Sequence, residues 1–431
     1  MEKFPLMNTR LYLRSPSINV CFRVIIEGTI CENNLAKALK AVCIRHPFLN
    51  SFVELDNNNA AWLIKRNIPF SVEYYKSNEM DWQTWYKRND DAVFDFSQGP
   101  LVKFCVITDN NTEIIILGHH IIGDGVGYLN LIKDILLSLD DRMEVAPQIP
   151  PFQAPDTYFK ETILLDEGVR SYATSLNEKW KLNRVRFSEN DYVDFFKAYR
   201  KKFVPNLYMT SIAGDNFLNL LKKAKSSGLT VNEIIAVAFS VSTKEILEID
   251  EIRLGIALNI RNELVSEPKE CMGNYSSGIS VKTHYDPKLD FITNAKKIAE
   301  TIQEQLSNVK ARHLAVHFLN EFEKDLIESI VFAAYSTFDH SVSKKLAELI
   351  GERTENKGIG ISNLGRFENI NYSNFEIVDL YFIGPAFPAN LITVDVITIR
   401  DKLNLCIRYN EEELNIDTVK LISKKAIGFL I

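Results

Sequence analysis

The sequence is poor in the residues that build disulfide scaffolds and membrane spans. It has only six cysteines in 431 residues, and no two of them form a CxxC pair. Most of them lie in apolar runs, which predicts buried free thiols in a reducing compartment. No apolar run approaches the roughly 18 residues of a membrane-spanning helix, and the N-terminus lacks the apolar segment of a signal peptide. We therefore expect a cytoplasmic protein without a transmembrane segment.

An excess of basic residues is also lacking. The 50 Lys and Arg residues stand against 56 Asp and Glu residues, which gives a formal net charge of −6. This balance argues against nucleic acid as a partner. The shares of apolar residues (46%) and charged residues (25%) are those of a globular protein. The length leaves room for two or three domains of about 150 residues, or for one unit built twice.

Both halves of the chain combine strand and helix patterns. Apolar residues alternate over 20–26, which predicts a strand, and then recur at helical spacing over 35–43. Further strands are predicted near 52–55, 62–64, 101–108, 113–118, 252–258, 358–363, 375–383, 391–400 and 403–409. Because hairpin-like neighbours occur in both halves, we expect an α+β fold with mixed sheets rather than a doubly wound parallel sheet.

A proline-rich stretch separates the two halves. Four prolines stand within 146–155, a density that neither a helix nor an inner strand tolerates. We therefore predict an N-terminal half over 1–150, a connector over 151–190 and a C-terminal half over 191–431.

Two of the seven histidines are adjacent at the end of the most apolar predicted strand. The run 114–118 leads directly into His119 and His120, and Asp124 and Gly125 follow before a predicted helix. Successive side chains of a strand point to opposite faces. One ring is therefore expected to face a cavity and the other the interior. The pair is either structural, or a metal site, or the source of a general base.

The metal interpretation is the weakest of the three. Rings on opposite faces cannot easily grip one ion, and Asp124 alone does not complete a coordination shell. His313 and His317 have the i, i+4 spacing of a helical metal site, but neither the intervening glutamate of HExxH nor a third ligand accompanies them. We expect no metal site.

The segment His119 to Gly125 reads HHxxxDG. It resembles the hallmark of the chloramphenicol-acetyltransferase-like acyltransferases, which include condensation domains of nonribosomal peptide synthetases, alcohol acetyltransferases and polyketide-associated acyltransferases. The similarity covers nearly the whole chain in the right order. It is carried further by 45–49 (RHPFL), 259–261 (NIR), 273–275 (GNY) and 362–367 (SNLGRF). The DFGWG motif of the plant branch is absent, and SNLG resembles the alcohol acetyltransferases instead.

The resemblance implies a fold and a set of roles. Two chloramphenicol-acetyltransferase-like halves would form a pseudo-dimer in one chain, with the active site between them. His120, the second histidine of the motif, would be the general base, because a neutral imidazole titrates near working pH. Asp124 would brace the loop by pairing with Arg261 rather than complete a triad. His119 would be structural.

Three further positions follow from the same resemblance. Gly125 would let the acyl donor approach. Ser362 or Asn363 would donate a hydrogen bond to the oxyanion that forms on the thioester carbonyl. A strand-end turn bond is the alternative role for Asn363.

These residues predict an acyltransferase. The acyl group would come from acyl-CoA or from a phosphopantetheine thioester on a separate carrier protein, and an alcohol or amine would accept it. No tightly bound cofactor is expected, and a duplicated chain favours a monomer. Two alternatives stay open: a free-standing condensation domain that forms an amide, and a catalytically silent relative that binds carrier protein or lipid.

Overall fold

The structure is a computed structural model. It describes residues 3–6, 10–56, 60–66, 71–148, 158–161, 163–351, 357–368 and 370–431. Most of the proline-rich stretch at 146–155, and with it the start of the predicted connector, lies outside the described residues. The boundaries predicted for the two halves stay a prediction.

A five-stranded sheet forms the centre of the N-terminal half. Its strand order is β12-β2-β7-β6-β5, and all neighbours are antiparallel except β5 and β6. Helices α2 and α4 cover one face, and α3 covers the other. The elements are β2 (Asn19–Glu27), α2 (Glu32–Arg45), β5 (Val72–Lys76), α3 (Trp82–Asp90), β6 (Val102–Thr108), β7 (Asn111–His119), α4 (Gly125–Leu139) and β12 (Ile377–Ile383).

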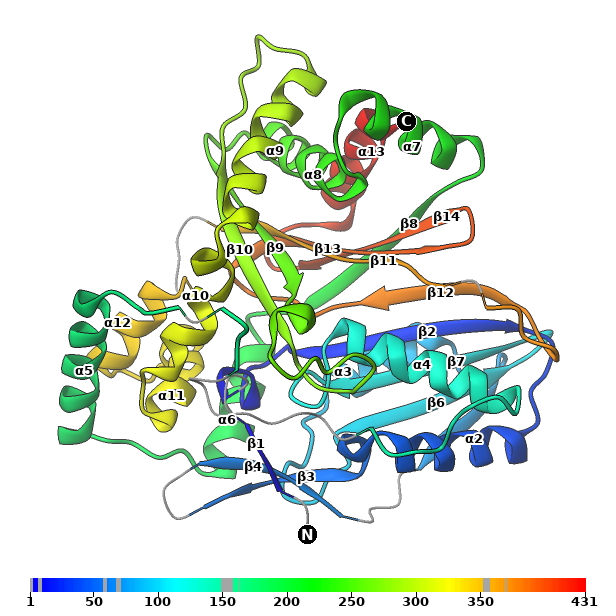
Figure 1. Ribbon diagram of the computed structural model, residues 1–431, viewed down its shortest axis with the longest axis horizontal. Helices are drawn as coiled ribbons and strands as arrows, with labels where there is room; N and C mark the ends of the chain where they lie inside the picture. The colour runs from blue at the N-terminus through cyan, green and yellow to red at the C-terminus, as the bar shows by residue number, and fades with distance from the viewer. Residues whose placement is uncertain are drawn as a thin grey trace.

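A six-stranded sheet forms the centre of the C-terminal half. Its order is β10-β9-β11-β13-β14-β8, and β11 runs parallel to both of its neighbours. Figure 1 shows α7, α8, α9 and α13 together on the outer side of this sheet. The elements are β8 (Pro205–Ala213), α7 (Asp215–Ser227), α8 (Val231–Leu247), β9 (Ile252–Asn259), β10 (Ser276–Thr283), α9 (Phe291–Ser307), β11 (Gly358–Arg366), β13 (Asn390–Ile399), β14 (Lys402–Asn410) and α13 (Ile416–Leu430).

The other elements surround the two sheets. A small sheet of order β1-β4-β3 lies near the N-terminus, and α5, α10, α11 and α12 gather at one side of the molecule (Figure 1). Their bounds are β1 (Lys3–Pro5), α1 (Arg10–Leu13), η1 (Pro47–Asn50), β3 (Ser51–Leu55), β4 (Ala61–Lys65), α5 (Glu167–Leu182), α6 (Glu189–Arg200), η3 (Arg261–Glu263), α10 (Val309–Asn320), α11 (Lys324–Tyr335) and α12 (Ser341–Leu349). The sequence patterns above predict neither α11 nor α12.

One strand joins the two halves. β12 comes late in the chain, yet it pairs antiparallel with β2, so that Leu380 lies opposite Val24. It also lies against β13 and β14 of the six-stranded sheet. A strand from the C-terminal part of the sequence is therefore an edge strand of the N-terminal sheet. The α+β fold of two halves with mixed sheets is confirmed.

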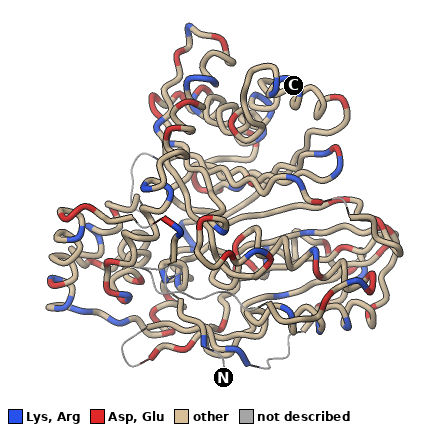
Figure 2. The backbone as a smooth tube through the Cα atoms, viewed as in Figure 1, with Lys and Arg blue, Asp and Glu red and all other residues tan. Residues whose placement is uncertain are grey.

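The distribution of charge on the surface and the burial of most cysteines agree with what the composition predicts. Figure 2 shows Lys and Arg interspersed with Asp and Glu over the helices and loops. Five cysteines are buried as free thiols, but the prediction is wrong for Cys31, which is exposed just before α2. None of the described helices combines the length and the apolar character that crossing a membrane requires.

Candidate active site

A cavity of about 330 Å³ lies where the two halves meet. The N-terminal half contributes Tyr12, His120, Asp124 and Gly125, and the C-terminal half contributes residues of β9, β10, β11 and β13. The volume lies within the range of small-molecule sites, about 300–1,000 Å³. A site built from two halves can hold two reactants against each other.

Small residues of the six-stranded sheet make room for this cavity. Gly255, Ala257, Gly278 and Gly360 all line it. Gly360 is in register with Gly255, and Gly278 with Ala257, so the four lie on one face of the sheet. A Cβ at Gly255 would meet only a backbone oxygen, 3.6 Å away. The space above this glycine therefore belongs to the cavity and not to a neighbouring side chain.

His119 ends β7 and points into the core. Its ring meets the rings of Phe94 and Phe96 edge-on, with centroids 6.0 and 5.2 Å away. Only 2% of the residue is exposed. Burial, together with the neighbouring His120, lowers the pKa of His119 to about 3. Its surroundings are those of an uncharged structural side chain.

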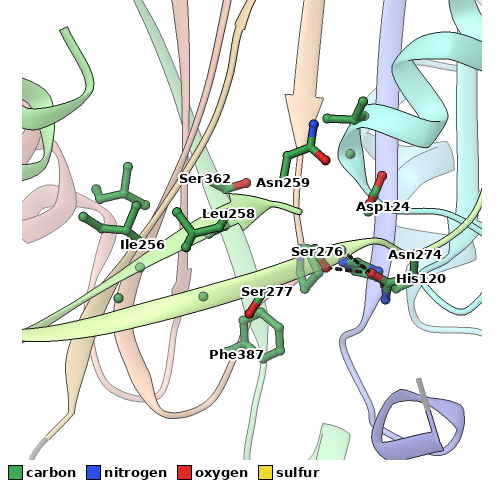
Figure 3. Close-up of a pocket in the computed structure, with 18 of the residues that line it drawn as sticks. His120, Asp124, Ile256, Leu258, Asn259, Asn274, Ser276, Ser277, Ser362 and Phe387 are labelled. Carbon is green, nitrogen blue, oxygen red and sulfur yellow. Dashed lines mark hydrogen bonds between the residues drawn. The ribbon is translucent and has the colours of Figure 1, made fainter. Parts of the chain in front are cut away.

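His120 turns to the other side and lines the cavity. Its ring lies 5.3 Å from the ring of Tyr12, and its Nδ1 is 2.9 Å from Nδ2 of Asn274 (Figure 3). Burial lowers the pKa of His120, while the negative charge of Asp124 and a hydrogen bond to the residue's own backbone offset part of this effect. The imidazole is therefore neutral at pH 7, as a general base must be.

Two hydrogen bonds orient the side-chain amide of Asn274 in this structure. Its Oδ1 accepts hydrogen bonds from the backbone N–H and the hydroxyl of Ser276, at 3.1 and 2.7 Å. The amide NH₂ therefore faces Nδ1 of His120. In this arrangement Nδ1 accepts, and the neutral ring carries its proton on Nε2. In this ring form Nδ1 is bonded to Asn274 and Nε2 carries the proton, so the orientation of the Asn274 amide is coupled to the position of the proton on His120.

Asp124 is fully occupied by contacts that hold the two halves together. Its carboxylate binds both Nη atoms of Arg261 at 2.8 Å, and it accepts the backbone N–H groups of Gly127 and Tyr275 at 2.7 and 2.8 Å. Burial alone would raise its pKa, but the Arg261 guanidinium and these hydrogen bonds hold the pKa below the usual value. Among the described residues, no hydrogen bond joins Asp124 to the ring of His120. The geometry is that of a brace, not of a catalytic triad.

Two glycines allow the halves to approach closely at this brace. A Cβ at Gly125 would lie 2.7 Å from the side chain of Leu364 in β11. A Cβ at Gly127 would lie 3.2 Å from the backbone oxygen of Gly273 and 3.3 Å from Nη2 of Arg261. The backbone oxygen of Gly273 accepts from the N–H of Asp124 at 3.1 Å. Gly125 therefore serves the packing of the interface as well as lining the cavity.

Ser362 and Asn363 both line the cavity from β11, but their side chains differ in the contacts that they make. Oδ1 of Asn363 accepts the N–H of Gly365 at 2.8 Å, and its Nδ2 donates to Asn232 at 3.3 Å. The turn bond that sequence reasoning held open for Asn363 is thus present. The hydroxyl of Ser362 points toward the cavity beside Asn259 and Leu258 (Figure 3).

Sequence reasoning gave no role to Asn274 or Tyr12, the two residues that touch the ring of His120. The GNY segment was the available signal for Asn274, because each of its residues contacts the HHxxxDG turn. His313 instead lies stacked on Phe159, with ring centroids 3.9 Å apart, and bonds to Glu263 at 2.5 Å. Across the described ranges, no group of three or more His, Cys, Asp and Glu side chains is arranged to hold a metal ion.

Comparisons with known proteins bear on the family and the fold. The model of the condensation domain family matches residues 7–158. Bacitracin synthase 1 of Bacillus licheniformis is 23% identical over 321 residues, which is 70% of this chain but only 6% of that synthase.

Two solved structures share the fold across the chain. The trichothecene 15-O-acetyltransferase TRI3 of Fusarium sporotrichioides has a TM-score of 0.69 at 12% identity, covering 99% of this chain and 95% of that one. The starter condensation domain of rhizomide synthetase, in complex with C8-CoA and Leu-SNAC, has a TM-score of 0.60 at 12% identity, covering 98% and 90%. The predicted resemblance is confirmed: the chain has the fold of the chloramphenicol-acetyltransferase-like condensation superfamily, and its first third matches the condensation domain family in sequence.

Proposed function

We propose that this protein is an acyltransferase that moves an acyl group from a CoA or carrier-protein thioester to an alcohol or amine. The observation that carries the proposal is the placement of His120. Its neutral ring lines a cavity built from both halves, and Asn274 holds it from one side. A purely structural histidine has no need of such access, as His119 illustrates.

The proposed step needs one base and no covalent enzyme intermediate. The acceptor oxygen or nitrogen attacks the thioester carbon while Nε2 of His120 takes the acceptor's proton. The new C–O or C–N bond forms, the carbonyl oxygen becomes an oxyanion, and the C–S bond then breaks as the carbonyl re-forms. The departing sulfur receives the proton from His120. Thiolate is a good leaving group, so the acyl group can pass directly to the acceptor.

A base at Nε2 requires the proton of the neutral ring to sit on Nδ1. In the arrangement described above, the NH₂ of Asn274 faces Nδ1. We infer that the Asn274 amide turns over during the reaction, or when substrate binds, and presents its oxygen to Nδ1–H. The hydrogen bond between His120 and its own backbone favours the same ring form. Asn274 is then the positioning residue of the base.

Ser362 is the better placed of the two candidate oxyanion donors. Its hydroxyl lies at the cavity surface, whereas the amide of Asn363 is engaged by Asn232 and Gly365. A preorganised donor of this kind contributes about 3–4 kcal/mol to lowering the barrier of acyl transfer. The Asp124–Arg261 pair contributes by tying the His120 turn to Gly273 and Tyr275, just before β10.

A test measures release of free thiol from a panel of acyl-CoAs mixed with alcohols and amines. Turnover that is lost in His120→Ala and kept in His284→Ala, an exposed histidine away from the cavity, supports the proposal. Unchanged turnover in a folded His120→Ala variant would show the base assignment to be wrong.

The amide-forming condensation domain is the second candidate, because the curated relative is a peptide synthase and the rhizomide structure holds an amino-acid thioester analogue. Turnover with loaded carrier proteins, but with no acyl-CoA, would favour it. A silent relative would turn over neither class of thioester and would still bind carrier protein or lipid.

A further inference from the structure

The cavity continues away from His120 across the six-stranded sheet. Asn274 lies just before β10, and the cavity floor then crosses β9 and β11 to Thr393 and Asp395 on β13. Three strand spacings of about 4.8 Å make this path roughly 14 Å long. Its floor includes the small residues Gly278, Gly255 and Gly360, and the side chains of Asn390 and Thr393 lie over Gly360 at the far end. The space therefore suits an elongated ligand rather than a compact one.

A buried acid stands at the far end of this path. Asp395 lines the cavity and is only 1% exposed. It is in register with Ser362, and Thr393 is in register with Gly360, so both side chains lie on the face of the sheet that forms the floor. Asn390, whose amide donates to the Thr393 hydroxyl at 3.3 Å, completes a polar end to a largely apolar space.

Only one oxygen of Asp395 has a structural partner. Oδ2 accepts the backbone N–H of Gly384 at 2.7 Å, which ties the end of β12 to β13. Oδ1 has no hydrogen-bond partner among the residues that the structure describes. An asparagine would supply the Gly384 contact equally well, so this contact does not explain the second oxygen. A buried polar atom without a partner is costly.

The charges around Asp395 favour a neutral partner. Arg408 on the neighbouring strand donates to the oxygen of Gly384 at 2.8 Å and lies 3.8 Å from Asp90, which also pairs with Arg200 at 3.4 Å. Two arginines thus already balance the two buried acids, Asp90 and Asp395, and Arg200 also lies 3.4 Å from the exposed carboxylate of Asp91. Burial raises the pKa of Asp395 to about 7, with the Gly384 bond and Arg408 opposing the shift. An added ammonium group would unbalance the cluster, whereas a hydroxyl would not.

We propose that one substrate of this enzyme extends past its reacting atom and carries there a hydroxyl group that donates a hydrogen bond to Oδ1 of Asp395, one strand beyond Ser362. This inference rests on the proposed function for its identification of a reacting end at His120. The hydroxyl can belong either to the acyl group or to the acceptor, and the experiment separates these two sources.

The first arm compares kcat/KM for plain and ω-hydroxylated acyl-CoAs, from hexanoyl to dodecanoyl, with one acceptor. The second arm compares monoalcohols with diols of the same lengths, with one donor. In one arm, and at a particular length, we expect the hydroxylated member to be preferred at least tenfold, because a site built for a hydroxyl leaves its polar atom unpaired with the plain analogue. No preference in either arm would overturn the proposal, and this comparison needs no variant.

In Asp395→Asn, the amide oxygen can still accept the N–H of Gly384. The amide NH₂ takes the place of Oδ1, so that a donor replaces the acceptor there. The preference for the hydroxylated member should fall at least tenfold in this variant. The matched control is Asp140→Asn, a buried acid that also accepts a backbone N–H, from Ser373 at 2.7 Å, but does not line the cavity. A preference that survives Asp395→Asn unchanged would contradict the assignment.

Calorimetric titration with ω-hydroxylated and plain fatty acids of the same lengths separates this inference from the proposed function. Tighter binding of the hydroxylated acid by the unaltered protein, lost in Asp395→Asn, supports the subsite even if no thioester is turned over. Turnover of thioesters without any such discrimination would leave the proposed function standing and remove the subsite.

Discussion

His119 and His120 are neighbours of the same residue type, and the structure gives them opposite surroundings. His119 lies edge-on to Phe94 and Phe96 in the core, whereas His120 lies beside Tyr12 and Asn274 at the cavity. Burial lowers the pKa of both rings. A shifted pKa therefore does not separate the proposed base, His120, from the histidine in the core.

His119 and His120 differ in their access to the cavity and in their hydrogen-bond partners. The last residue of β7 still has the alternation of a strand, so its ring enters the core, and the next residue must turn outward. The ring that turns outward meets the other half of the chain. The two histidines of the motif thus occupy unequal positions, His119 in the core and His120 at the cavity. Changes at the two positions should have effects of different kinds.

The largest expected effect is on turnover. His120→Ala should lower kcat/KM by about 10²–10⁴-fold, the usual contribution of a positioned general base. His119→Leu should change it by far less, because its ring does not reach the cavity. Steady-state thiol release with circular dichroism of each variant provides the measurement. Equal losses of turnover in the two folded variants would contradict the different roles proposed for His119 and His120.

Loss of the Asp124–Arg261 pair, which braces the His120 turn, should lower stability more than it lowers turnover. Asp124→Ala should lower the free energy of unfolding by about 3–5 kcal/mol, because it leaves the Arg261 charge buried without its partner. Urea unfolding of this variant, of Arg261→Gln and of the double variant forms a cycle that isolates the pair. Strictly additive losses would show that the pair is not coupled. A stable Asp124→Ala protein with abolished turnover would instead assign Asp124 a chemical role.

Local signals in the sequence predicted their structures well. Thr230 and Glu233, at the Thr-x-x-Glu spacing typical of a capping box, form such a box at the start of α8, and Gly228 ends α7 in the left-handed conformation with φ 70°. Such features depend on residues a few positions apart, so a sequence pattern contains all that is needed. The strand that ends in His119 is equally local.

Long-range contacts were not accessible in the same way. The pairing of β12 with β2 joins Leu380 to Val24, and no periodicity of either strand specifies its partner. The contact between Asn274 and His120 spans 154 positions. The approach of Arg261 to Asp124 was expected only because of the family resemblance. A site between two halves is defined by such contacts, which depend on how the sheets pack rather than on local pattern.

The core position of His119 should appear in the pH dependence of stability. Below about pH 6.5 the unfolded chain binds a proton at this residue, while the folded protein resists until about pH 3. The contribution of the uncharged His119 ring to the free energy of unfolding is therefore fully present above pH 6.5 and falls as the pH is lowered toward 3. By pH 5 this loss amounts to about 2 kcal/mol. Unfolding of His119→Leu at pH 7.5 and pH 5 should lack that component, and an unchanged pH dependence would contradict the burial argument.

The smallest expected effect distinguishes the two ring forms of His120. Asn274→Asp offers only oxygen atoms to Nδ1, so the ring must place its proton there and leave Nε2 free. A base at Nε2 should then keep kcat/KM within about tenfold of the unaltered protein, a change of no more than about 1.4 kcal/mol. The added carboxylate should also raise the pKa of His120 and move the acid limb of the pH profile upward. Asn274→Leu, which removes the contact, should lose more activity without that upward shift. If Asn274→Asp lowered kcat/KM more than Asn274→Leu does, Nε2 would have to act as a proton donor to the oxyanion. His120 would then not be the base.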